Sequence, residues 1–119
     1  MINTKFYDGF EGEPELVLTD GENKLIIWYG YFETVLDSLL DNNLEKRGII
    51  KDYFNHEGWH DDSPWVIQDL RLTIAQMKSF DINTLDVSED MKSVLADLIN
   101  EIIHFLENAK NKTVVIEYD

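Results

Sequence analysis

The sequence predicts a single α+β domain over residues 1–119, in which a small, mostly antiparallel sheet packs with three main helices. Three observations lead to this prediction. Two β-rich runs flank a turn-forming segment near the N-terminus, three stretches in the middle carry apolar residues at helical spacing, and a β-branched run closes the chain. A chain of 119 residues has the usual length of one domain and can bury a core without disulfides.

The predicted sheet combines an N-terminal hairpin with a C-terminal strand. Residues 2–7 form a short first strand, and residues 15–19 and 24–29 form the hairpin around a polar turn with one glycine. Because Leu25 to Trp28 are all apolar, the second hairpin strand is expected to be central and covered on both faces. Residues 113–118 are rich in β-branched side chains and are expected to join the same sheet.

The first helix is expected to begin at Tyr31 and to end at Arg47. Its apolar residues recur at steps of three and four, and Gly48 suits the left-handed position that follows a helix. Residues 49–54 satisfy neither the helical nor the strand period, so their conformation stays open.

Two further helices are expected in the second half of the chain. One opens at Ser63 and Pro64 and runs to about Phe80. Serine can cap a helix, and proline is tolerated in the first turn because the backbone N–H that it lacks has no partner within the helix there. The other opens at the cap Ser88 and ends near residues 108–112, with a broad apolar face that predicts a central helix.

The formal charge of −14, from 24 acidic and 10 basic residues, restricts the partners of this domain. Nucleic acids and anionic membranes repel such a surface, because phosphate binding depends on Lys and Arg. A basic protein is the partner that this charge favours, although acidity can also serve solubility alone.

The sequence also lacks the features of several other classes of protein. Without cysteine there is no disulfide framework, thiolate nucleophile or cysteine zinc site, as is common in a reducing compartment. The first residues do not resemble a secretory signal, and the longest apolar run, residues 25–29, is far too short to cross a bilayer. We therefore expect a soluble cytoplasmic protein.

One motif suggests an enzyme. His56, Glu57 and His60 form the His-Glu-x-x-His string of zinc peptidases, in which two histidines bind zinc and the glutamate acts as a general base. Gly58 weakens a helix there by about 1 kcal/mol, and the polar residues that follow suggest that no helix continues. Because His104 is the only other histidine and lies on a different predicted helix, we expect no metal, no cofactor and no catalytic residue. A small zinc hydrolase remains the alternative.

The same stretch also has the composition of a protein interface, in which aromatic anchors lie within a charged rim. The residues expected to contact a partner are Glu57, Trp59, Asp61, Asp62, Trp65 and Asp69. Alternatively, the two tryptophans belong to the core and Asp69 is a local structural acceptor. A second acidic group is expected to extend this surface around the hairpin: Glu11, Glu13, Glu15, Asp20 and Glu22.

A short segment that opens the second helix carries a family resemblance. It reads Gly58-Trp59, then Asp61-Asp62-x-Pro64-Trp65-x-Ile67-x-Asp69. In this small, acidic, cysteine-free chain it resembles the immunity proteins of bacterial polymorphic-toxin and contact-dependent growth inhibition systems. The resemblance implies a cytoplasmic, non-enzymatic inhibitor that binds a cognate toxin domain, often a basic nuclease. An orphan regulatory or structural domain is a further alternative.

Overall fold

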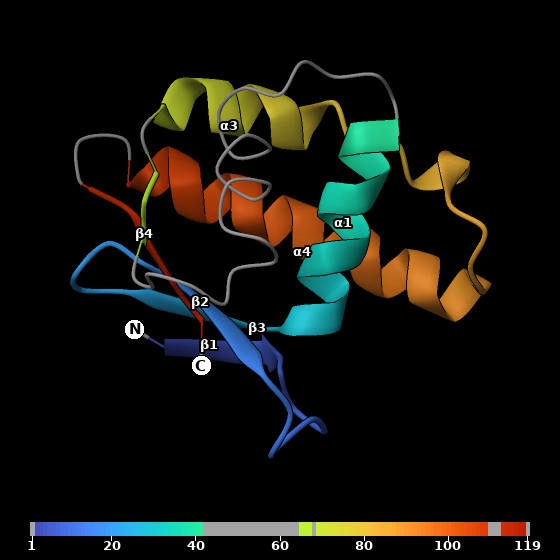
Figure 1. Ribbon diagram of the computed structural model, residues 1–119, viewed down its shortest axis with the longest axis horizontal. Coiled ribbons are helices and arrows are strands. Elements are labelled where there is room, and N and C mark those ends of the chain that lie inside the picture. Colours follow the sequence, from blue (N-terminus) through green and yellow to red (C-terminus); the bar gives the residue numbers. More distant parts are fainter. Residues whose placement is uncertain (1, 42–64, 68, 110–112, 119) are drawn as a thin grey trace.

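The computed structural model describes residues 2–41, 65–67, 69–109 and 113–118, and it confirms the α+β class (Figure 1). A five-stranded mixed sheet has the strand order β1-β3-β2-β5-β4. Its strands are β1 (Ile2–Phe6), β2 (Glu15–Thr19), β3 (Lys24–Trp28), β4 (Trp65–Val66) and β5 (Val115–Tyr118). Because three of the four neighbouring pairs are antiparallel, the sheet is mostly antiparallel, as predicted.

The predicted hairpin and closing strand are both confirmed. β2 pairs antiparallel with β3, and Leu18 lies opposite Leu25 on one edge and opposite Ile116 of β5 on the other. The turn is closed by the Asp20 side chain, which accepts hydrogen bonds from the backbone N–H groups of Glu22 and Asn23 at 2.9 and 2.7 Å. The hairpin and β5 therefore form the antiparallel centre of the sheet.

The environment of β3 differs from the prediction in one respect. The strand is central, but only Leu25 and Ile27 are buried, whereas Ile26 and Trp28 on the other face are half-buried. On the edge away from β2, β1 pairs with β3 in parallel, which strand composition alone does not indicate. The apolar run thus reflects one covered face and one partly covered face.

The start of the second predicted helix is corrected. Trp65 and Val66 form β4, which pairs antiparallel with β5, and the N–H of Ile67 donates to the carbonyl of Val114 at 2.9 Å. Because the backbone of these residues is engaged in the sheet, α3 (Leu70–Lys78) begins only after the cap Asp69. The expected opening residues, 63 and 64, lie outside the described part of the chain.

The other helices follow the predictions more closely. α1 (Tyr29–Asp41) begins two residues earlier than expected, and its predicted end at residues 47–48, like segment 49–54, lies outside the described residues. α4 (Glu89–Asn108) begins after Ser88, whose hydroxyl accepts from the N–H of Met91 at 3.1 Å. A short 3₁₀ helix, η1 (Ile82–Thr84), connects α3 to α4.

The helices gather on one face of the sheet, with α4 between the sheet and α3 (Figure 1). Four residues of α4 that face this core are at most 1% exposed: Leu95, Leu98, Ile102 and Leu106. They pack in one cluster with the inward residues of the sheet, which are equally buried: Leu16, Leu18, Leu25, Ile27 and Ile116. Within the described residues, no helix is long and apolar enough to span a membrane.

Candidate functional site

Only two of the predicted contact residues, Trp65 and Asp69, lie in the described part of the chain. Trp65 is 6% exposed on β4 and belongs to the hydrophobic core, so its ring is packed inside the domain. Asp69 is exposed, and its carboxylate accepts from the N–H of Leu72 at 3.0 Å as the cap of α3. Both residues thus have the structural roles that the sequence left open as alternatives.

The remaining predicted residues of this stretch lie outside the described residues. They are the contact residues Glu57, Trp59, Asp61 and Asp62 and the alternative zinc ligands His56 and His60. Metal analysis of the purified chain, with His60→Ala as the comparison, is therefore the way to decide the zinc alternative.

The second predicted acidic group is divided between the two ends of the hairpin. Glu11, Glu13 and Glu15 lie at the open end, where Glu15 is opposite Trp28, whereas Asp20 and Glu22 lie in the turn. Five residues of antiparallel strand separate the ends by about 17 Å. The hairpin acids therefore form two groups. Within the described residues, a set of stacked aromatic rings lies beside the group at the open end.

The acidic loop, residues 7–14, joins β1 to β2 and projects from the end of the sheet (Figure 1). It carries the exposed carboxylates of Asp8, Glu11 and Glu13. The Tyr7 hydroxyl donates to the carbonyl of Glu13 at 2.6 Å, which ties the two ends of the loop together. Gly9 has a φ of 93°, a conformation that side chains other than glycine rarely adopt, and its N–H donates to Oε1 of Glu11 at 3.3 Å. These contacts give the loop a defined shape.

An aromatic cluster of Phe10, Trp28 and Tyr31 lies beside this loop. Phe10 stacks on Trp28 with ring centroids 4.2 Å apart, and Tyr31 meets both rings edge-on at 5.4 and 4.9 Å. The three rings come from the loop, the end of β3 and the first turn of α1, and all are half-buried. Such pairs add about 0.5–1.5 kcal/mol beyond the burial of their area.

Residue type and spacing alone do not indicate this cluster. Phe10 lies between the predicted strands 2–7 and 15–19, whereas Trp28 lies in a predicted strand and Tyr31 at the start of a predicted helix. The predicted hairpin contained the necessary signal, because strands 15–19 and 24–29 around a four-residue turn place Trp28 opposite Glu15 and so next to the loop.

A cavity of about 140 Å³ opens beside the cluster, where the acidic loop meets β1, α1 and α4. We name it the acidic–aromatic pocket. Its lining combines three rings with three charged groups: Phe6, Phe10, Tyr31, Lys5, Asp8 and Asp97. Nζ of Lys5 lies 3.9 Å from Oδ2 of Asp97 and 5.4 Å from the Phe6 ring centroid. The pocket therefore places a cation between an aromatic ring and the Asp97 carboxylate.

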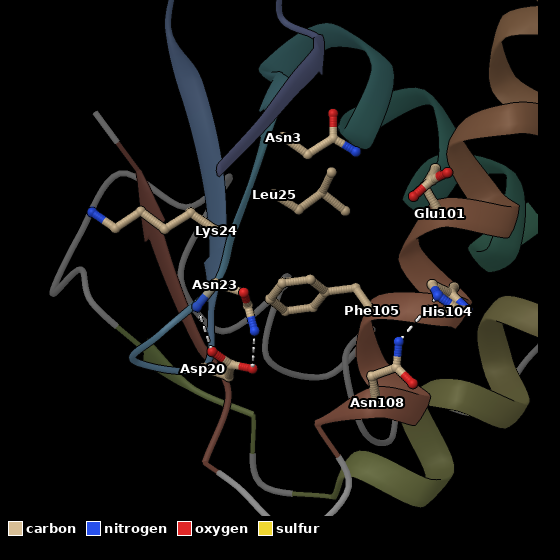
Figure 2. Close-up of a pocket in the computed structure, with 9 residues that line it drawn as sticks. All are labelled: Asn3, Asp20, Asn23, Lys24, Leu25, Glu101, His104, Phe105 and Asn108. Carbon is tan, nitrogen blue, oxygen red and sulfur yellow. Dashed lines mark hydrogen bonds between the residues drawn. The ribbon is translucent and has the colours of Figure 1, made fainter. Parts of the chain in front are cut away.

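A second and larger cavity, of about 170 Å³, lies between the hairpin turn and α4 (Figure 2). Glu101, His104, Phe105 and Asn108 line it from one side of α4, and the Phe105 ring points toward the hairpin. Nδ2 of Asn108 and Nε2 of His104 are 3.0 Å apart. The lining mixes amide, acidic, basic and apolar groups from both elements, so it does not select one class of ligand.

Within the described ranges, no three His, Asp or Glu side chains are grouped closely enough to bind a metal ion. Comparisons with protein-family models, curated proteins and solved structures found no match for this chain.

Proposed function

We propose that this chain is a non-enzymatic binding protein for a basic protein partner, and that it acts as an immunity protein toward a toxin domain. The observation that supports this proposal is the fixed acidic loop beside the aromatic cluster, at one end of a domain with a charge of −14. Carboxylates around half-buried rings are the combination that a protein interface uses.

The two parts of this surface have different effects on binding. Exposed acids at the loop raise the rate at which a basic partner arrives, because opposite charges steer the encounter. Aromatic residues supply the buried contacts that slow dissociation, and interface hot spots are enriched in Trp and Tyr. Because Phe10, Trp28 and Tyr31 already pack on one another, ordering them on binding costs little conformational entropy.

The partner in this proposal is a basic toxin domain, and a nuclease fits because the carboxylates imitate the phosphates of its substrate. Glu57, Trp59, Asp61 and Asp62 remain proposed contact residues, and with them the interface would have two acidic segments. The proposal includes a cytoplasmic location and no affinity for nucleic acid or anionic membrane.

Co-expression tests the proposal. The neighbouring reading frames are searched for a toxic C-terminal domain, any such domain is expressed with this chain, and growth and complex formation are measured. We expect the chain to restore growth and to co-purify with that domain in one-to-one ratio. A chain that neither binds nor neutralises the domain would refute the immunity function.

A pair of charge variants locates the contact. The first variant carries Asp8→Asn, Glu11→Gln and Glu13→Gln in the acidic loop, and the control carries Asp86→Asn, Glu89→Gln and Asp90→Asn at the start of α4. Both lose three exposed carboxylates, so their net charges are equal. We expect the loop variant to associate about tenfold more slowly and the control to stay within about twofold of the unmodified chain. Equal effects would mean that only the total charge matters.

A further inference from the structure

The acidic–aromatic pocket has the size of a single side chain. Its volume is about 140 Å³, close to the engineered cavity of about 150 Å³ that binds benzene. Unlike that cavity it opens between charged groups, with Asp8 and Asp97 exposed at its edge and the Phe6 ring only 3% exposed inside. A ligand that fits must therefore be apolar or flat along its length and positively charged at one end.

The walls of the pocket are held in place before any ligand enters. Phe10 and Tyr31 pack on each other and on Trp28, and Phe6 belongs to the hydrophobic core. Val94 and Asp97 lie on α4, one turn apart, so their spacing is fixed by the helix. A ligand can use these groups without first ordering them.

The chain already places one of its own cations in the pocket. Lys5 lies over the Phe6 ring and beside Asp97, and it is the one basic residue among the described residues that line the pocket. Its side chain is 63% exposed and that of Asp97 is 59% exposed. An ion pair this open is weak, so a better cation can displace it.

From these contacts we infer that the acidic–aromatic pocket receives an arginine side chain of the basic partner, which displaces Lys5. This inference rests on the proposed function. A guanidinium is planar, stacks flat on aromatic faces and donates two parallel hydrogen bonds to a carboxylate. The Lys5 ammonium contacts the Phe6 ring only as a point charge and cannot donate such a parallel pair. Lys5 acts as a weak internal competitor that pairs with the Asp97 carboxylate until the partner arrives.

The test uses small probes, so that it does not depend on the partner. N-acetyl-arginine-N-methylamide is titrated into the isotopically labelled full chain, and NMR follows the resonances of Phe6, Phe10 and Tyr31. The N-acetyl-citrulline derivative serves as an uncharged probe of the same shape. We expect saturable shifts with arginine, with a dissociation constant on the order of millimolar, and none with citrulline. Equal binding of citrulline, or no saturation by arginine up to about 100 mM, would overturn the inference.

Two variants separate the pocket from the general charge of the protein. Lys5→Met keeps the side-chain length and removes the competitor, so arginine should bind about two- to fivefold more tightly. Lys78→Met is the matched control, because Lys78 is similarly exposed at 56% and pairs with Glu107 at 3.5 Å. Glu107 lies ten residues beyond Asp97 on α4, about 15 Å along the helix. If both variants tighten binding equally, the effect is charge alone and the displacement of Lys5 is refuted.

Asp97→Asn completes the series and should weaken arginine binding at least about threefold while the fold is retained. An unchanged affinity would contradict the role of this carboxylate.

The arginine titration and the co-expression test can fail independently of each other. Neutralisation of the toxin domain without arginine binding would refute this pocket alone, and arginine binding without neutralisation would refute the immunity function alone.

Discussion

The missing side chain of Gly30 sets the position of the aromatic cluster. A Cβ at this residue would lie 2.5 Å from Cη2 and 2.7 Å from Cζ2 of Trp28, closer than such atoms approach in proteins. The indole cannot simply move away, because Phe10 stacks on it and Tyr31 meets its edge. Glycine in the first turn of α1 is therefore needed for the cluster to form.

Gly30→Ala should lower the free energy of unfolding by about 1–3 kcal/mol, because the methyl group overpacks the indole. In an ordinary helix the same change would stabilise by up to about 1 kcal/mol. Urea denaturation gives the stability, and near-ultraviolet circular dichroism reports the packing of the tryptophans. In a Trp28→Leu background the substitution should become neutral or stabilising. An equal loss in both backgrounds would show that the ring is not the cause.

Tyr118 provides a test at alkaline pH. Burial raises the pKa of its hydroxyl above the ordinary 10.0, and the Glu33 carboxylate raises it further. The folded state thus favours neutral tyrosine, so the contribution is fully present below pH 10 and is lost as the pH rises through the folded pKa. Tyr118→Phe keeps the edge-on ring contact with Tyr29, which is 5.1 Å between centroids.

Between about pH 9 and pH 11 the unmodified chain should lose more stability than Tyr118→Phe. Urea midpoints of the two proteins across this range measure the difference. Parallel curves would mean that the hydroxyl titrates alike in the folded and unfolded chains.

At the scale of elements, the start of α3 shows where local signals were insufficient. Ser63 and Pro64 form a good helix opening, but Asp69 is an equally good cap six residues after Ser63. The choice depends on β5, which is about fifty residues away in sequence and binds the backbone of Trp65 and Val66. Long-range pairing of this kind leaves no local periodicity, whereas the hairpin and the cap Ser88 depend on neighbouring residues and were predicted correctly.

The cap role of Asp69 predicts different results for two substitutions. Asp69→Ala should cost about 1 kcal/mol of stability, because the N–H of Leu72 loses its acceptor. Asp69→Asn keeps an acceptor oxygen and should cost only a few tenths. Urea denaturation distinguishes them. If asparagine destabilises as much as alanine, the charge of Asp69 rather than its capping hydrogen bond is what matters.

For the whole molecule, the class and the antiparallel centre of the sheet were predictable, but the candidate site was only partly so. The acids Glu11 and Glu13 were selected from composition, whereas Phe10, Tyr31 and Asp97 come together only through the packing of the loop, α1 and α4. Trp65 is buried in the core, although its residue type alone suggested an aromatic contact in a protein interface. Composition thus identified a charged surface, and tertiary packing determined which rings lie beside it.

The central claim is electrostatic capture of a basic partner, and the salt dependence of association tests it most directly. Stopped-flow mixing of the chain with the toxin domain identified by the co-expression test gives the association and dissociation rate constants at each salt concentration. Between about 50 and 300 mM NaCl the association rate constant should fall about tenfold or more, with little change in dissociation. An association rate constant that does not change with salt would contradict the account.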